Sequence, residues 1–415
     1  MTTPDVTALT PHLDFVRAQF PALAGPWTFL DNAGGSQVLT SVADRVRDYL
    51  LQTSVQLGAS YAVSQEAAAR VADGTRAAAE LINAADVREV VLGSSATQLV
   101  ANFAQSFGAT LREGDEIIVT STDHEANIGA WMRTRGAVVR VWRTRPDTLD
   151  LHLDDLDALL TDRTRLVCVT HASNILGRIN PVAQIARRTH AGGAKLFVDG
   201  VAYAPHRLVD VQALDADFYM FSFYKVFGPH ISLLYGKLDG LLALPNINHG
   251  FVGEQAVPYK LQPGNLNYEL TYSLRAITEY LGELGARVQP GADGRAALMA
   301  AYAAIADHEA TLAGVLLDYL SSRSRVRVIG PVSADPDVRV ATISFTVEGS
   351  PSSKFPRALD DHFIAIRYGH FYARRLMDEF ALDPSEGVVR VSMAHYNTVQ
   401  DINRLIERLD ATGLD

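Results

Sequence analysis

The chain of 415 residues contains a single cysteine, Cys168, so it cannot form an intrachain disulfide. Such sparing use of cysteine is typical of proteins from reducing compartments. The opening MTTPDVTALTPHLDF lacks the basic stretch and apolar stretch of a secretory signal. No apolar run approaches the roughly 18 residues that a membrane-spanning helix needs. We therefore expect a cytoplasmic protein with no membrane partner.

An excess of positive charge is also missing. The chain has 37 Lys and Arg against 47 Asp and Glu, a formal net charge of −10. This balance disfavours nucleic acid or an anionic membrane surface as a partner. The hydrophobic content of 48% is ordinary for a globular protein and is ample for a large core.

Several standard motifs are absent. There is no GxGxxG after a predicted strand, no GxxxxGK[ST] and no GxSxG. The sequence therefore lacks the motifs that form dinucleotide-binding, P-loop and α/β-hydrolase sites. The stretch Asp123-His124-Glu125 is the nearest approach to a metal motif. Neighbouring side chains on a strand point to opposite sides, however, and no HExxH or Cys/His spacing supports it. We expect no metal.

Short apolar runs alternate with helical segments through the first two thirds of the chain. The predicted strands are 89–93, 116–121, 138–143, 165–171, 195–201 and 218–223, with helices such as 96–108 and 181–193 between them. This alternation predicts an α/β fold with a mostly parallel sheet between helices. The pattern then changes to a long helix, strands and a last helix at 399–409, as in a smaller α+β domain. We expect three parts: residues 1–27 packing on the body, a large domain at 28–290 and a small domain at 291–415.

The residue that ends each strand is the place to look for chemistry, because ligands of such sheets bind beyond the carboxyl ends of the strands. Lys225 follows the apolar run DFYMFSFY, and Asp199 ends the preceding strand. A buried amine loses its proton easily and is then a good nucleophile. A nearby carboxylate can hold a protonated pyridine nitrogen, which is what pyridoxal 5′-phosphate (PLP) requires. The two residues alone are equally compatible with a structural ion pair.

Two further strand ends suit the same interpretation. Gly93-Ser94-Ser95 lies between a strand and a helix and offers N–H groups and hydroxyls to a phosphate, although such a turn can also be a plain helix cap. Ser222 lies three residues before Lys225, within reach of the same anion. His124 can stack on an aromatic ring or serve as a structural histidine.

The motifs occur in the order of a known family. They are Phe29–Gly34 (FLDNAG), Asp123–Asn127 (DHEAN), His171–Gly177 (HASNILG), Val198–Gly200 (VDG), Ser222–Lys225 (SFYK), Val389–Ser392 (VRVS) and Tyr396–Thr398 (YNT). Through these motifs the chain resembles the class V aminotransferases, a family of fold-type I PLP enzymes. Within that family it resembles the cysteine desulfurases. The resemblance covers most of the chain. It implies a seven-stranded type of sheet in the large domain, PLP as the cofactor, an amino acid or amine as substrate, and a homodimer with the active site at the subunit interface.

The resemblance also implies roles for individual residues. Lys225 would form the Schiff base and carry the Cα proton, Asp199 would bind the ring nitrogen, and His124 would stack on the ring. The other cofactor-binding positions would be Asn174 near the ring, with Ser94, Ser95, Ser222, Tyr224 and the partner's Asn265 on the phosphate. Substrate-binding positions would be Asn32, Arg367, Tyr372 and Arg390, of which Arg390 would bind the α-carboxylate.

The departures from the family pattern bear on the reaction. Ala202 replaces a glutamine that bonds the phenolic oxygen of the cofactor, and Tyr224 replaces a histidine. Tyr372 stands where the desulfurases have the cysteine that takes the sulfur as a persulfide, and Cys168 fits a small core residue. We therefore favour transamination or β-elimination. A desulfurase with an unusual sulfur acceptor, a racemase or epimerase, and a non-catalytic PLP-fold binding or regulatory protein remain alternatives.

Overall fold

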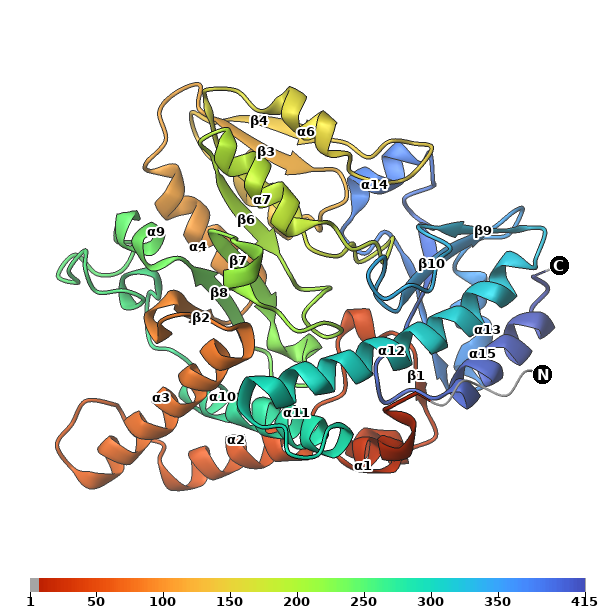
Figure 1. Ribbon diagram of the computed structural model, residues 1–415, viewed down its shortest axis with the longest axis horizontal. Helices are drawn as coiled ribbons and strands as arrows, with labels where there is room; N and C mark the ends of the chain where they lie inside the picture. The colour runs from red at the N-terminus through yellow and green to blue at the C-terminus, as the bar shows by residue number, and fades with distance from the viewer. Residues whose placement is uncertain (1–6, 415) are drawn as a thin grey trace.

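The computed structural model describes residues 7–414 and is built on a seven-stranded sheet (Figure 1). The strand order is β2-β8-β7-β6-β5-β3-β4. All neighbouring strands are parallel except β8, which is antiparallel to both β2 and β7. The strands are β2 (Val90–Gly93), β3 (Glu116–Thr120), β4 (Val138–Trp142), β5 (Thr164–Thr170), β6 (Lys195–Asp199), β7 (Phe218–Ser222) and β8 (Ser232–Gly236). The predicted α/β class and mostly parallel sheet are confirmed, whereas β8 was not predicted.

Helices cover both faces of this sheet because successive residues of its strands face opposite sides. Phe197 and Met220 pack with α4 (Ala96–Gly108), α5 (Ala126–Met132) and α9 (Leu238–Ala243). Val198 and Tyr219 pack on the other face with α3 (Ala62–Ile82), α6 (Leu153–Leu159), α7 (Val182–Ala191) and α11 (Arg275–Val288). Cys168 is fully buried on the α4 face, in line with its prediction as a core residue.

A second, antiparallel sheet lies to the right in Figure 1, with the strand order β12-β13-β10-β9. Its strands are β9 (Val326–Ile329), β10 (Thr342–Val347), β12 (Arg367–Gly369) and β13 (Val388–Ser392). Helices α13 (Lys354–Asp360) and α15 (Val399–Ala411) contribute to its core. The described helices also include α1 (Leu13–Ala18), α2 (Thr40–Gln52), α8 (Val211–Leu214), α10 (Tyr268–Ser273) and α14 (Arg374–Glu379).

Two segments connect the cores of the two sheets. Helix α12 (Gly294–Ser321) packs its first half in the core of the large sheet and its second half in that of the small sheet. Strand β1 (Thr28–Phe29) pairs in parallel with β11 (Ile364–Ala365), which places the chain after residue 27 beside the small sheet. The division into domains at residues 28–290 and 291–415 stays a prediction. Helix α12 and strand β1 each pack against the part of the chain on the other side of that boundary.

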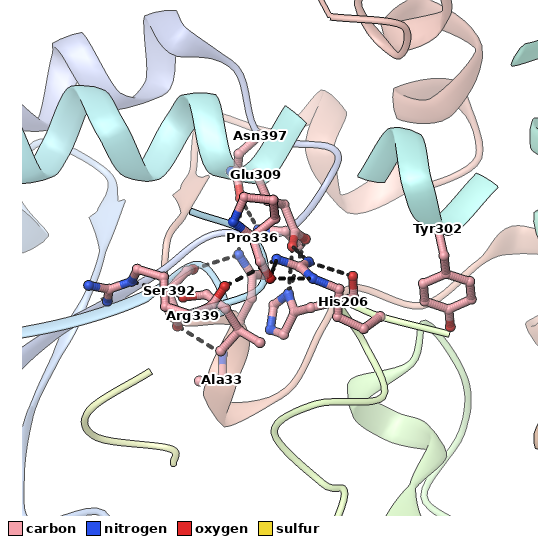
Figure 2. A network of polar contacts seen from close by, with 12 residues as sticks. Ala33, His206, Tyr302, Glu309, Pro336, Arg339, Ser392 and Asn397 are labelled. Atoms are coloured by element: carbon pink, nitrogen blue, oxygen red, sulfur yellow. Dashed lines mark hydrogen bonds and ion pairs between the residues drawn. The ribbon is translucent and has the colours of Figure 1, made fainter. Parts of the chain in front are cut away.

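Buried polar contacts join the two parts at α12 (Figure 2). The carboxylate of Glu309 is only 1% exposed and lies 2.9 Å from Nδ1 of His206 and 3.5 Å from Nη1 of Arg207. The Arg207 guanidinium also donates to the carbonyls of Pro336 and Arg339, at 3.0 and 3.1 Å. A buried carboxylate without such partners would be costly. The contacts therefore stabilise one arrangement of the two sheets.

The described residues contain neither a helix suited to cross a membrane nor a cluster of side chains suited to hold a metal ion. None of the helices within residues 7–414 combines the length and apolar character needed to cross a bilayer. In the same range, no cluster of three or more His, Cys, Asp or Glu side chains is arranged to hold a metal ion.

Candidate active site

Lys225 lies just beyond β7, in a short 3-10 helix (Phe223–Lys225) at the carboxyl edge of the large sheet. Its side chain is 9% exposed. Loss of hydration and, to a smaller extent, the charge of Arg390 lower the pKa of Lys225 to about 8, against the raising effect of Asp199. About a tenth of this amine is therefore neutral at pH 7, far more than for an ordinary lysine, and the neutral form is the one that acts as a nucleophile or base.

The loop that carries Lys225 is held by the N-terminal part of the chain. The Ser36 N–H donates to the carbonyl of Tyr224 at 3.1 Å, and the Ser36 hydroxyl accepts from the N–H of Phe227 at 2.9 Å. These contacts flank the lysine on both sides. They restrict the backbone from which its amine extends.

The Lys225 amine opens into a chamber at the ends of the parallel strands. The chamber is lined by Ser95, Ala96, Thr97, His124, Ala126, Thr170, Ala172, Asn174, Asp199, Val201, Ala202, Ser222, Tyr224 and Lys225. Strand ends far apart in sequence meet here because neighbouring parallel strands end at one edge of the sheet. Seven of the predicted cofactor positions line one space: Ser95, His124, Asn174, Asp199, Ser222, Tyr224 and Lys225.

Asp199 ends β6 and is 4% exposed. Its Oδ1 accepts the N–H of Val201 at 2.9 Å. Burial raises the pKa of Asp199 to about 6, against the lowering effects of that hydrogen bond and of Lys225. Such a carboxylate gains from a cationic N–H donor placed against it. The neighbouring Gly200 is required, because a Cβ there would lie 2.2 Å from the ring of Tyr219.

His124 is held as a neutral imidazole. Burial, with smaller contributions from the charges of Lys225 and Arg390, lowers the pKa of His124 to about 4. Its Nδ1 accepts the N–H of Ala126 at 3.1 Å, which leaves the proton on Nε2. The flanking side chains point elsewhere: Asp123 accepts from Asn127, and Glu125 pairs with Arg375.

The start of α4 lines one end of the chamber. Ser95 caps this helix, its hydroxyl accepting the N–H of Gln98 at 3.1 Å, and Thr97 lies in the first turn. The Ser222 hydroxyl lies beside them, 2.7 Å from that of Ser232 on β8. Hydroxyls at the N-terminus of a helix favour a phosphate. Thr97 was not predicted, and its place two residues after the capping Ser95 is the signal that could have found it.

Ser94 and Asn265 do not line the chamber. Both lie along an adjoining groove of about 520 Å³, together with Gln98 and His230. The Ser94 hydroxyl donates to the side-chain oxygen of Gln98 at 2.6 Å. The structure thus separates Ser94 from Ser95, which the sequence placed together.

A wider cleft of about 680 Å³ continues outward from Lys225. It shares His124, Asn174, Tyr224 and Lys225 with the chamber and is also lined by Ala33, Gly34, Arg367, Tyr368, Gly369, His370, Phe371, Tyr372, Pro384, Ser385 and Arg390. Three of the four predicted substrate positions, Arg367, Tyr372 and Arg390, therefore lie along this cleft.

Arg390 is fully buried on β13, directly opposite Arg367 on β12. Like charges at such opposite positions repel. Asp31 bridges them, with its carboxylate oxygens 3.0 Å from Nη2 of Arg390 and 3.0 Å from Nε of Arg367. Arg390 also donates to the carbonyl of Asn174 at 3.3 Å, and its Nε has no hydrogen-bond partner within the described residues. Burial lowers the pKa of Arg390 to about 10, so the group remains a cation at neutral pH.

Asn32 does not line the cleft, contrary to its expected place in the substrate site. Its Nδ2 donates to the carbonyls of Phe29 and Ser392 at 3.0 and 2.9 Å, and its Oδ1 accepts from the hydroxyl of Tyr396. These bonds use the amide to tie the N-terminal strand to β13. Within this motif, Asp31 contacts the arginines of the cleft, although it was not predicted, and the predicted Asn32 does not.

The side chains of the chamber fit PLP. A buried carboxylate on one strand, hydroxyls at a helix N-terminus and a largely desolvated amine match a pyridine nitrogen, a phosphate and an aldehyde, respectively. Asn174 provides an amide within the same space. The alanine at position 202 leaves that part of the wall without a polar side chain.

Comparison with known proteins agrees with this site. A family model described as aminotransferase class-V matches residues 28–405. The aminotransferase-like protein FGM3 of Gibberella zeae is 43% identical over 96% of this chain and 98% of its own length. A cysteine desulfurase of Dickeya dadantii is 34% identical over 96% of both chains. The crystal structure of the cysteine desulfurase CsdA (S-sulfonic acid) from Escherichia coli matches with a TM-score of 0.82 at 29% identity, covering 96% of this chain and 98% of that one.

These matches extend over nearly the whole chain and include the segments that line the chamber and the cleft. The family is enzymatic, and its members depend on PLP, the cofactor that the chamber fits. The chain belongs to the class V aminotransferase family, in its cysteine desulfurase-like part.

Proposed function

We propose that the chain is a PLP-dependent enzyme that acts on an L-amino acid or small amine by transamination or β-elimination. The observation that carries this proposal is the joint placement of Lys225 and Arg390. The desolvated amine of Lys225 lines both the chamber and the outer cleft, and the buried guanidinium of Arg390 lines the same cleft. A structural ion pair between Asp199 and Lys225 alone would explain neither Arg390 nor its unpartnered Nε.

Within this proposal each residue has a physical task. PLP supplies the electron sink that makes the Cα–H bond of an amino acid acidic. Lys225 removes and returns that proton, Asp199 keeps the ring nitrogen protonated, and Arg390 binds the α-carboxylate. His124 would stack on the ring. Ser95, Thr97 and Ser222 would bind the phosphate, with Tyr224 at the chamber wall.

Persulfide chemistry is the less favoured alternative. The position of the desulfurase cysteine is Tyr372, whose phenol cannot carry sulfur as a thiolate does. Cys168 is fully buried in β5, where loss of hydration raises the pKa of its thiol well above the usual value. A sulfur acceptor needs an accessible thiolate. Racemisation is also less favoured, because neutral His124, with Nδ1 already accepting a hydrogen bond, is a poor second base.

We further propose a homodimer in which each subunit contributes to the other's site. The groove lined by Ser94 and Asn265 adjoins the phosphate end of the chamber. Phe251 and Tyr259, in the same part of the chain, are 84% and 48% exposed. A second copy covering this region would bury those rings and bring the partner's Asn265 toward the phosphate. The single unpaired cysteine suits a reducing compartment, and we propose the cytoplasm.

A spectral screen tests the proposed activity. The protein is purified with PLP and mixed with individual amino acids, the absorbance of the bound cofactor is followed, and products are identified by mass. Keto acid indicates transamination, and pyruvate with a thiol indicates β-elimination. Lys225→Ala should abolish turnover. Full turnover in that variant, or a bound cofactor that responds to no amino acid or amine, would overturn the proposal and favour a binding or regulatory protein.

A further inference from the structure

The outer cleft is larger than a small amino acid requires. Its volume of about 680 Å³ lies in the range of roughly 300–1,000 Å³ that is typical of pockets for drug-sized ligands. The cleft and the chamber share His124, Asn174, Tyr224 and Lys225 as lining residues, so the two spaces lie next to each other. A substrate in the chamber therefore has room to extend outward.

The direction of that extension follows from the proposed function, on which this inference rests. Lys225 and the cofactor take the α-amino group, and Arg390 takes the α-carboxylate. The substituent of Cα that remains free is the side chain. The space still open beside these groups is the outer cleft, toward Tyr368, His370 and Ser385.

Two aromatic residues in the wall of the cleft, Phe371 and Tyr372, stand where the desulfurase pattern has histidine and cysteine, respectively. Cζ of Arg390 lies 3.7 Å and Cζ of Arg367 lies 5.2 Å from the ring centroid of Phe371. Tyr372 is 66% exposed, with its ring centroid 5.1 Å from that of His124. An exposed ring in the wall of the cleft, next to His124, offers apolar contact area to a side chain.

Several contacts hold this aromatic segment in place. The Tyr372 carbonyl accepts the N–H of Glu125 at 2.8 Å, and the Tyr372 N–H donates to Nδ1 of His370 at 3.0 Å. The Phe371 carbonyl accepts from Nδ2 of Asn174 at 2.9 Å. Phe371 and Tyr372 have φ angles of 47° and 61°, a left-handed conformation that bulky residues rarely adopt unless their surroundings impose it. The wall is therefore formed before any substrate arrives, which lowers the entropy cost of binding.

We propose that the outer cleft is a side-chain subsite, with Phe371 and Tyr372 as its specificity-determining residues. The substrate is then an L-amino acid with an extended side chain of about four or more non-hydrogen atoms, whose apolar or flat part packs on the rings. Amino acids of the size of alanine, serine or cysteine leave the subsite empty.

The test is a homologous series of amino acids. The PLP-loaded protein is titrated with L-alanine, L-norvaline and L-norleucine, and each Kd is measured from the absorbance of the bound cofactor and by calorimetry. Each buried methylene contributes about a fourfold gain in affinity, so full burial of three would give about 60-fold. Because the cleft is partly open, we expect norleucine to bind at least about tenfold more tightly than alanine.

Two variants and a control assign the effect to the rings. Tyr372→Ala and Phe371→Ala should reduce the norleucine-to-alanine ratio, and Tyr372→Phe should retain it. The matched control Tyr61→Ala, at an exposed tyrosine that lines neither the chamber nor the cleft, should leave the ratio unchanged. If amino acids change the spectrum but alanine binds as tightly as norleucine, the subsite is wrong and the proposed function stands. A preserved ratio in both alanine variants would likewise reject the subsite, and a spectrum that responds to no amino acid would overturn both proposals.

Discussion

Removing the Lys225 ammonium should stabilise the cofactor-free protein, by an amount that depends on pH. The pKa of Lys225 falls from 10.5 to about 8 on folding, mainly through loss of hydration and then through the charge of Arg390, while Asp199 opposes the change. The unfolded chain therefore binds more protons at this group than the folded chain does. Stability must rise with pH between these two values, and the full cost is present below pH 8.

The size of the effect follows from the same shift. A drop in pKa from 10.5 to about 8 corresponds to about 3 kcal/mol of lost stability at pH 7. At pH 10 the cost is below about 1 kcal/mol, because this pH lies only about half a unit below the pKa of 10.5 in the unfolded chain, so little free energy is still linked to protonation there. Lys225→Met removes the charge and keeps a long, flexible side chain, so it should recover most of this energy. Lys225 thus serves the proposed function at a cost in the free energy of unfolding.

Urea unfolding of the cofactor-free wild type and of Lys225→Met measures this cost. Both proteins are unfolded at pH 7, 8, 9 and 10, at equal concentration, with circular dichroism as the signal. We expect the variant to be more stable at pH 7 by up to about 3 kcal/mol and the difference to shrink to under about 1 kcal/mol at pH 10. Lys354→Met, at an exposed lysine, is the control and should show no such trend. A difference that is the same at pH 7 and pH 10, or a wild type that is more stable than the variant at pH 7, would refute the reasoning.

Three further predictions concern the site. Arg390→Gln should raise KM for an amino acid by about 10- to 100-fold, which is the value of a charge-assisted contact. KM for the corresponding decarboxylated amine should not change, and equal increases for both compounds would contradict the role of Arg390. The rate at which the cofactor-free protein takes up PLP should rise with pH through about 8, because only the neutral Lys225 amine adds to an aldehyde; a flat profile between pH 6 and 9 would contradict this. Cys168→Ala should keep turnover and lower stability by about 1–2 kcal/mol, the cost of a small core cavity; loss of turnover in a folded variant would show that the thiol takes part.

Strand ends were the most informative feature of the sequence. Lys225 and Asp199 were identified because a charged residue that ends an apolar run contradicts the composition of a core strand, and such a local conflict points to a function. The parallel topology then requires their side chains to meet, since neighbouring parallel strands end at one edge of the sheet. Strand β8 escaped prediction because its five residues lack the preceding helix that marks the other strands.

Contacts between distant segments explain the remaining differences. Asn32 and Asp31 are adjacent in one motif, and only the pairing of that segment with β13 turns Asp31 toward the two arginines and Asn32 into the protein. Likewise, the turn at the start of α4 directs Ser95 and Thr97 to the chamber and Ser94 to the neighbouring groove. A sequence pattern places residues on an element but does not say which of two neighbours faces a ligand.

The sequence by itself determined the fold class, the family and the lysine–aspartate pair, because these depend on hydrophobic periodicity and on residue types at strand ends. Only the tertiary structure decided how the substrate side of the site is formed. The bridge from Asp31 to Arg367 and Arg390 joins segments more than 300 residues apart. The segment of Phe371 and Tyr372 is held by Asn174 and Glu125, which lie far earlier in the chain. Such contacts depend on how the segments around the two sheets pack against each other, and local sequence preferences carry no record of that packing.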